Sequence, residues 1–125
     1  MTPEERALLM VYASVRGRIQ IGVDKFFEAV KDFQVVPLTE QGEVIGGVLL
    51  KRNEIHVGCS SRPKGVARKY IRATLNSILK DYGHAVTSVQ ADNPAGLRFC
   101  ERLGFVKYAE QNGTIWLRCD RSNYA

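Results

Sequence analysis

The spacing of apolar residues changes along the chain from a helical to an extended period and back. The segment Thr2-Pro3-Glu4-Glu5 predicts a helix start, with a threonine cap, proline in the first position and glutamate three residues after the cap. Apolar residues then recur at helical spacing before Gly17, namely Leu8, Leu9 and Tyr12. A second short helix is predicted over Asp24–Lys31, so the first third of the chain is expected to be helical.

Between residues 34 and 58 the pattern is extended, and short turns divide it. The turn 40–43 and the turn Arg52-Asn53 separate three strands in a meander, Gln34–Leu38, Val44–Leu50 and Glu54–Gly58. Glycine weakens a strand unless it marks a bulge or a close approach of another backbone. Gly46-Gly47 in the middle strand therefore indicates one of these two features.

The second half alternates helices and strands with clear stop signals. An apolar stripe predicts a helix over residues 66–82, which Gly83 ends, and a strand follows over His84–Ala91. Asn93 and Pro94 begin another helix as its cap and first residue, and Leu103-Gly104 ends it. The turn 111–113, which contains Asn-Gly, predicts a terminal hairpin of Phe105–Glu110 with Thr114–Cys119.

These elements define the fold class. A strand, the helix over 66–82 and the strand His84–Ala91 form a crossover unit, which should be right-handed and should make Glu54–Gly58 parallel to the later strand. We therefore predict an α+β fold with a mixed, mostly antiparallel sheet, one parallel strand–helix–strand crossover and flanking helices. The chain of 125 residues, without repeat or linker, is expected to form one domain over 1–125.

The charge is uneven along the chain. Eighteen Lys and Arg against thirteen Asp and Glu leave a net charge of +5, which attracts polyanions such as nucleic acid or a phosphate-rich cofactor. A plain solvated basic face remains an alternative. Between residues 51 and 72 there is one acid, Glu54, and the bases are Lys51, Arg52, Arg62, Lys64, Arg68, Lys69 and Arg72.

Cysteine and histidine usage argues against a metal site. Three cysteines without a CxxC pair and two histidines make zinc binding an unfavoured interpretation, so we expect no metal and reduced thiols. No apolar run reaches the ~20 residues needed to cross a bilayer. The N-terminus is acidic where a secretory signal would be basic, and together these features predict a cytoplasmic protein.

The segment Arg62-Pro63-Lys64-Gly65-Val66-Ala67 lies where a strand passes into a helix. The first N–H groups of a helix have no partner within the helix, and its dipole favours anions there. A diphosphate can accept hydrogen bonds from them if small residues leave the backbone open, as Gly65 and Ala67 would. The alternative is that Gly65 only makes a turn.

With its flanking strand, residues 55–67, this loop resembles the coenzyme loop of the GNAT superfamily of N-acetyltransferases, Arg/Gln-x-x-Gly-x-Gly/Ala. A later segment, residues 93–105, resembles a second element of that family, which begins with asparagine and ends with Gly-Phe. The resemblance covers about residues 34–119. Three departures stand out: the N-terminus begins with a helix signal where the family has its first strand, Pro63 replaces a glycine, and Cys100 replaces a tyrosine.

The resemblance implies an enzyme that transfers an acetyl group from acetyl-CoA, as co-substrate, to a primary amine of a small molecule or protein. It implies that the backbone near Val57 positions the thioester and that Asn93 contacts the coenzyme. The remaining coenzyme-binding candidates are the loop residues and the start of the helix, Arg62, Lys64, Gly65, Val66, Ala67 and Arg68.

Three residues are candidates for proton transfer. Glu54 and His56 share one face of the strand that leads to the loop, and imidazole changes its protonation nearest to neutral pH, which favours His56 as base. Cys100 stands where the family's tyrosine protonates the departing thiolate. Alternatively, all three are ordinary strand or packing residues and solvent supplies the protons; Tyr108 and Tyr124 are substitutes that the spacing does not favour.

Two other functions stay open. A catalytically impaired GNAT-fold module, of the compact kind also encoded by bacteriophages, would bind coenzyme A or a protein partner without turnover. Nucleic-acid binding is the weakest hypothesis, because the phosphate loop already accounts for the clustered bases and no interleaved aromatics indicate base stacking. No membrane partner is expected, and a homodimer is open because the GNAT fold often pairs through its terminal strands.

Overall fold

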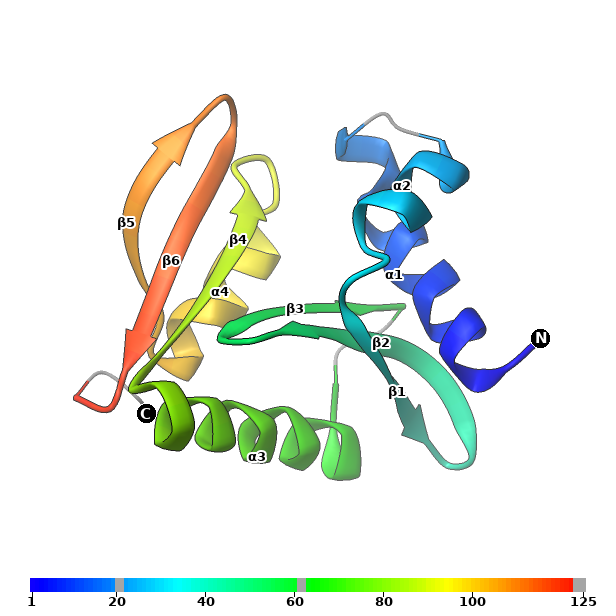
Figure 1. Cartoon of the computed structure of the whole chain (residues 1–125), viewed down its shortest axis with the longest axis horizontal. Helices are drawn as coiled ribbons and strands as arrows, with labels where there is room; N and C mark the ends of the chain where they lie inside the picture. The colour runs from blue at the N-terminus through cyan, green and yellow to red at the C-terminus, as the bar shows by residue number, and fades with distance from the viewer. Residues whose placement is uncertain (20–21, 61–62, 123–125) are drawn as a thin grey trace. The chain divides into compact units, whose positions relative to one another are not determined.

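The computed structural model describes residues 1–19, 22–60 and 63–122 of the chain (Figure 1). Its elements follow in the order α1 (Pro3–Ile19), α2 (Val23–Ala29), β1 (Gln34–Glu40), β2 (Glu43–Lys51), β3 (Glu54–Cys59), α3 (Gly65–Tyr82), β4 (His84–Gln90), α4 (Pro94–Leu103), β5 (Val106–Gln111) and β6 (Thr114–Asp120).

The strands are hydrogen-bonded in the order β1-β2-β3-β4-β6-β5. The pair β3–β4 is parallel, with Glu54 opposite Val86, whereas β1–β2, β4–β6 and β5–β6 are antiparallel. The predicted α+β class with one parallel crossover is therefore confirmed.

The structure divides into two units. Unit 1 consists of Met1–Lys51 and His56–Ile71, and unit 2 consists of Arg52–Ile55 and Arg72–Ala125. The single domain expected over 1–125 stays a prediction.

Most predicted elements appear with ends within two residues of the expected ones, but α1 extends through Gly17 to Ile19. Its start has the predicted capping box, because the Thr2 N–H donates to Glu5 Oε1 (2.9 Å) and the Glu5 N–H donates to Thr2 Oγ1 (3.0 Å). Hydrogen bonding of the Glu5 carboxyl to Thr2, first through the Thr2 backbone N–H and then through its side chain, holds the pKa of that carboxyl below its ordinary value. No described helix has the length and hydropathy needed to cross a membrane.

In unit 1, α1 packs on β1 and β2 (Figure 1). Glycines allow the close approach. A Cβ at Gly47 would lie 3.1 Å from the Ala7 Cβ, and a Cβ at Gly58 would lie 2.9 Å from the Val11 Cα. Among the side chains of this helix that the structure describes, Ala7 and Val11 are consequently the buried ones, whereas Leu8 is partly buried against the cluster around Phe26. Of the two features predicted at Gly46-Gly47, a bulge or a close approach, the structure has the close approach, and the β1–β2 register also shifts beside these glycines.

Unit 2 is built on larger side chains. Leu75 of α3 and Leu117 of β6 are fully buried, as is Cys119, whose Sγ lies 3.9 Å from the Leu103 carbonyl oxygen. The β5–β6 hairpin turns at Asn112 (φ 52) and Gly113 (φ 79), as the Asn-Gly signal predicts. The outer strand β5 of this hairpin is exposed along its whole length.

Candidate functional site

The predicted phosphate loop leads into α3 within unit 1. The Lys64 carbonyl accepts the first bond of the helix from the Arg68 N–H (3.3 Å), so Lys64 is the capping residue. The N–H groups of the next three residues precede the first intrahelical donor, and none of them has an acceptor among the described residues. These three donors belong to Gly65, Val66 and Ala67.

The backbone at this helix start is open. Gly65 has φ 50, in the left-handed region that glycine adopts without strain, and a Cβ built on it would have no heavy atom of the described residues within 4 Å. Val66 is 75% exposed, and the side chains of Lys64 and Arg68 are exposed as well, whereas Ala67 is buried. Arg62, the first residue of the motif, lies outside the described residues.

One loop amide already has an anionic partner. The Lys64 N–H donates to Glu40 Oε1 at 2.6 Å, across 24 positions of sequence. The same hairpin holds the beginning of the loop, because the Ile45 carbonyl accepts from both the N–H (2.8 Å) and the Oγ (3.1 Å) of Ser60. The sequence analysis placed Glu40 in the turn 40–43 and missed this contact, because the partner amide lies 24 positions away and no local pattern indicates it.

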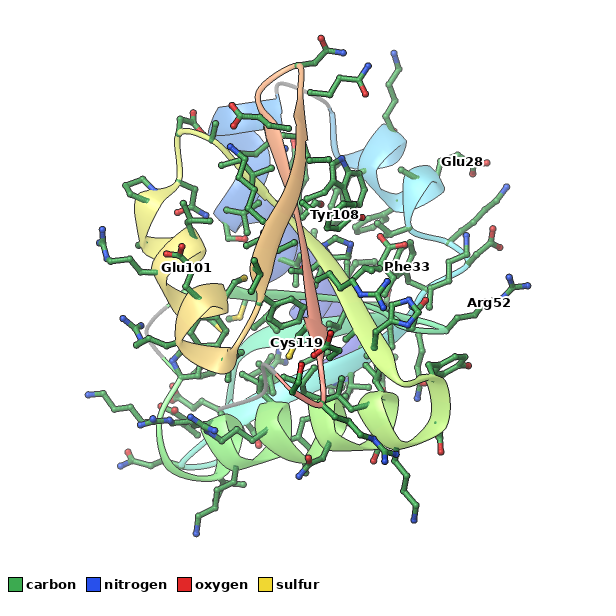
Figure 2. All side chains as sticks on the ribbon, turned by 90° about the vertical axis from the view of Figure 1, so that its left-hand side faces the viewer. Glu28, Phe33, Arg52, Glu101, Tyr108 and Cys119 are labelled. Atoms are coloured by element: carbon green, nitrogen blue, oxygen red, sulfur yellow. The ribbon has the colours of Figure 1, made fainter. Side chains whose placement is uncertain are left out.

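His56 lies in β3 among unit 1 side chains. Its half-buried ring meets the edge of Phe33 at 5.9 Å between centroids, and Lys51 Nζ lies 5.6 Å from the centroid of that Phe33 ring (Phe33 is labelled in Figure 2). Because side chains alternate along a strand and Gly58 faces α1, His56 shares the α1 side and Val57 points to the opposite side.

The remaining candidates belong to unit 2. The Asn93 side chain caps α4, since its Oδ1 accepts from the Gly96 N–H at 3.1 Å. Burial, assisted by the charge of Glu101, raises the pKa of Cys100 to about 12. Glu54 stands opposite Val86 in the parallel strand pair. His56, Val57 and the described loop residues thus belong to unit 1. Glu54, Asn93 and Cys100 belong to unit 2.

Of the two tyrosine substitutes, the structure describes only Tyr108, on the outer strand of the terminal hairpin. Tyr108 is 58% exposed on β5 (Figure 2), and Tyr124 lies outside the described residues. In the part of the chain that the structure describes, no group of three or more His, Cys, Asp or Glu residues could hold a metal ion.

No family model and no curated protein matches the sequence, whereas 23 solved chains share its fold. PH1933 of Pyrococcus horikoshii is 16% identical with a TM-score of 0.72, over 97% of this chain and 92% of that one. The ribosomal-protein-alanine N-acetyltransferase of Brucella melitensis is 13% identical with a TM-score of 0.67, over 96% of each chain. A GNAT family acetyltransferase of Elizabethkingia anophelis, solved with acetyl-CoA bound, is 12% identical with a TM-score of 0.62, over 87% and 89%.

Proposed function

Because this chain has the GNAT fold, as the two sequence motifs predicted, we propose that it transfers an acetyl group from acetyl-CoA to a primary amine. The open start of α3 is the observation that supports the proposal: the amides of Gly65, Val66 and Ala67 have no acceptor among the described residues. The coenzyme's doubly anionic diphosphate would accept hydrogen bonds from them, and the exposed Lys64 and Arg68 would add attraction.

In the proposed reaction, the neutral amine attacks the thioester carbonyl. A C–N bond forms and the C–S bond breaks, so the coenzyme leaves as a thiolate, which must gain a proton while the nitrogen loses one. His56, within the same unit as the loop, is our choice of base, acting directly or through a water molecule. The backbone near Val57 is assigned to the thioester oxygen, and Glu54 remains the alternative base.

The proton for the thiolate is assigned to solvent. The pKa of Cys100, raised to about 12 mainly by burial, exceeds the pKa of about 8.5 of an ordinary thiol, so Cys100 would donate a proton uphill. Catalysis would then depend on proximity of amine and thioester, which can contribute about 7 kcal/mol or more.

The raised pKa of Cys100 also favours a second candidate function. Without an efficient acid at residue 100, the chain would be a module that holds coenzyme A or a protein partner without turnover. The two candidates share the coenzyme loop and differ in whether thiol is released. Measurements of binding and turnover on the same protein therefore separate them.

Calorimetric titration with acetyl-CoA tests the loop. Asp tolerates the left-handed backbone better than most residues, so Gly65→Asp should keep the fold while placing a negative charge at the amides. We expect affinity to fall by at least about tenfold. Gly113→Asp is the matched control, since it makes the same change at another positive-φ glycine with open space, in unit 2.

Thiol release is then followed with a panel of amines. Coenzyme binding with thiol release supports the acetyltransferase, and binding without release from any amine supports the module. Equal affinity of wild type and Gly65→Asp would refute the loop as the diphosphate site. Salt-sensitive DNA binding without a response to the coenzyme would instead support the nucleic-acid hypothesis.

A further inference from the structure

The β1–β2 hairpin holds the coenzyme loop at two points. Glu40 is the last residue of β1, opposite Glu43, and its Oε1 accepts from the Lys64 N–H at 2.6 Å. The register shifts after Leu38, and Ile45, left unpaired by this shift, accepts both hydrogen bonds of Ser60. All of these residues belong to unit 1.

The two contacts differ in chemistry. The Ile45–Ser60 bonds are neutral and fix the strand end, whereas Glu40 brings a carboxylate to the N-terminal end of α3. The charge of Glu40 also acts on Cys59, since it is the second cause, after burial, that raises the pKa of that thiol to about 11. A carboxylate and a diphosphate are both anionic acceptors for the same backbone donor.

We propose that Glu40 competes with the coenzyme diphosphate for the Lys64 amide and thereby sets the protein's affinity for the coenzyme. This inference rests on the proposed function. In the free protein the carboxylate satisfies the amide and complements the helix dipole. When the coenzyme binds, the two anions repel each other at this short distance, so the Glu40 side chain turns away.

The position of Glu40 suits such an exchange. The contact is exposed, and Glu40 precedes a tight turn of Gln41 (φ 52) and Gly42 (φ 82), so a change of its side-chain rotamer frees the amide. The Ile45–Ser60 bonds are independent of that rotamer and would keep the loop attached to the hairpin. Glu40 therefore regulates access to one donor without unfolding the loop.

Calorimetric titration of wild type, Glu40→Gln and Glu40→Ala with acetyl-CoA tests this competition. Gln keeps an acceptor for the amide and removes the charge, whereas Ala removes both. We expect both variants to bind roughly five- to twentyfold more tightly than wild type. Glu43→Gln is the matched control, because it makes the same charge change across the same hairpin and should stay within about twofold of wild type.

The amide itself gives a second readout. In ¹⁵N–¹H spectra we expect the Lys64 resonance to move in Glu40→Gln, and to move in wild type when acetyl-CoA is added. Weaker coenzyme binding by the Glu40 variants would mean that Glu40 supports the loop, and equal binding would mean that it does not compete. Either result would overturn this inference and leave the proposed function untouched. If no variant and no wild type binds the coenzyme, the proposed function fails together with it.

Discussion

Helices α3 and α4 both follow a strand, yet α3 leaves more of its first amides without an acceptor among the described residues. At α4 the Asn93 side chain takes the Gly96 N–H, Pro94 has no N–H to offer, and a Cβ on Gly96 would lie 3.0 Å from the Asn93 Cγ. At α3 a carboxylate from another element reaches one amide, and three further donors stay unused among the described residues. A helix start can bind an anion only where its own sequence leaves the donors free.

The two units differ in packing as well. In unit 1 the α1 backbone approaches the strands through Gly47 and Gly58, so main chain lies against main chain. In unit 2 large side chains such as Leu75 and Leu117 fill the interior. Strand β3, which leads to the candidate site, thus packs through Gly58 so closely that an added Cβ would displace its neighbours.

Among the variants that test this difference between the units, Gly46→Ala should have the largest effect on stability. Its Cβ would lie 2.7 Å from the Cys59 Cα and would overlap the Gly58 carbonyl oxygen, so backbone must move. We expect the free energy of unfolding to fall by about 3 kcal/mol, measured by urea denaturation. Gly22→Ala is the control, since its Cβ would have no heavy atom within 4 Å in the part of the chain that the structure describes, and we expect a change of at most about 1 kcal/mol. Similar losses in both variants would contradict the close approach of β2 and β3.

Asn93→Ala, at the capped start of α4, should have an intermediate effect on stability. It removes the acceptor of the Gly96 N–H and should lower the free energy of unfolding by about 1 kcal/mol, whereas Asn93→Asp keeps a capping oxygen. If capping is its whole role, calorimetry should show coenzyme affinity within about twofold of wild type. A clear loss of affinity in Asn93→Ala at unchanged stability would instead support the coenzyme contact that the family resemblance implies.

Cys100→Ala should have the smallest effect on turnover. Since the pKa of Cys100 is raised to about 12, its thiol remains protonated at neutral pH and is a poor acid for the departing thiolate. We expect the kcat for thiol release to change by less than about threefold. A drop of ten times or more, with the fold preserved, would restore Cys100 as the proton donor.

The sequence by itself determined the elements, the fold class and the position of the loop, because their signals are local. Periodicity defined α3, the Thr2–Glu5 box and Asn93 defined helix starts, and Asn112-Gly113 defined a hairpin; each interaction spans only a few residues. The one misplaced end, at Gly17, is where a helix continues through a residue of low helix propensity.

Only the tertiary structure decided which groups meet. The contact of Glu40 with the Lys64 amide, the packing of Gly58 against Val11 and the burial that raises the pKa of Cys100 join or surround residues far apart in sequence. No local period encodes such contacts, since they depend on the register of the β1–β2 hairpin and on how closely α1 approaches the strands. For the same reason the sequence could locate the helix start but not the carboxylate that occupies it.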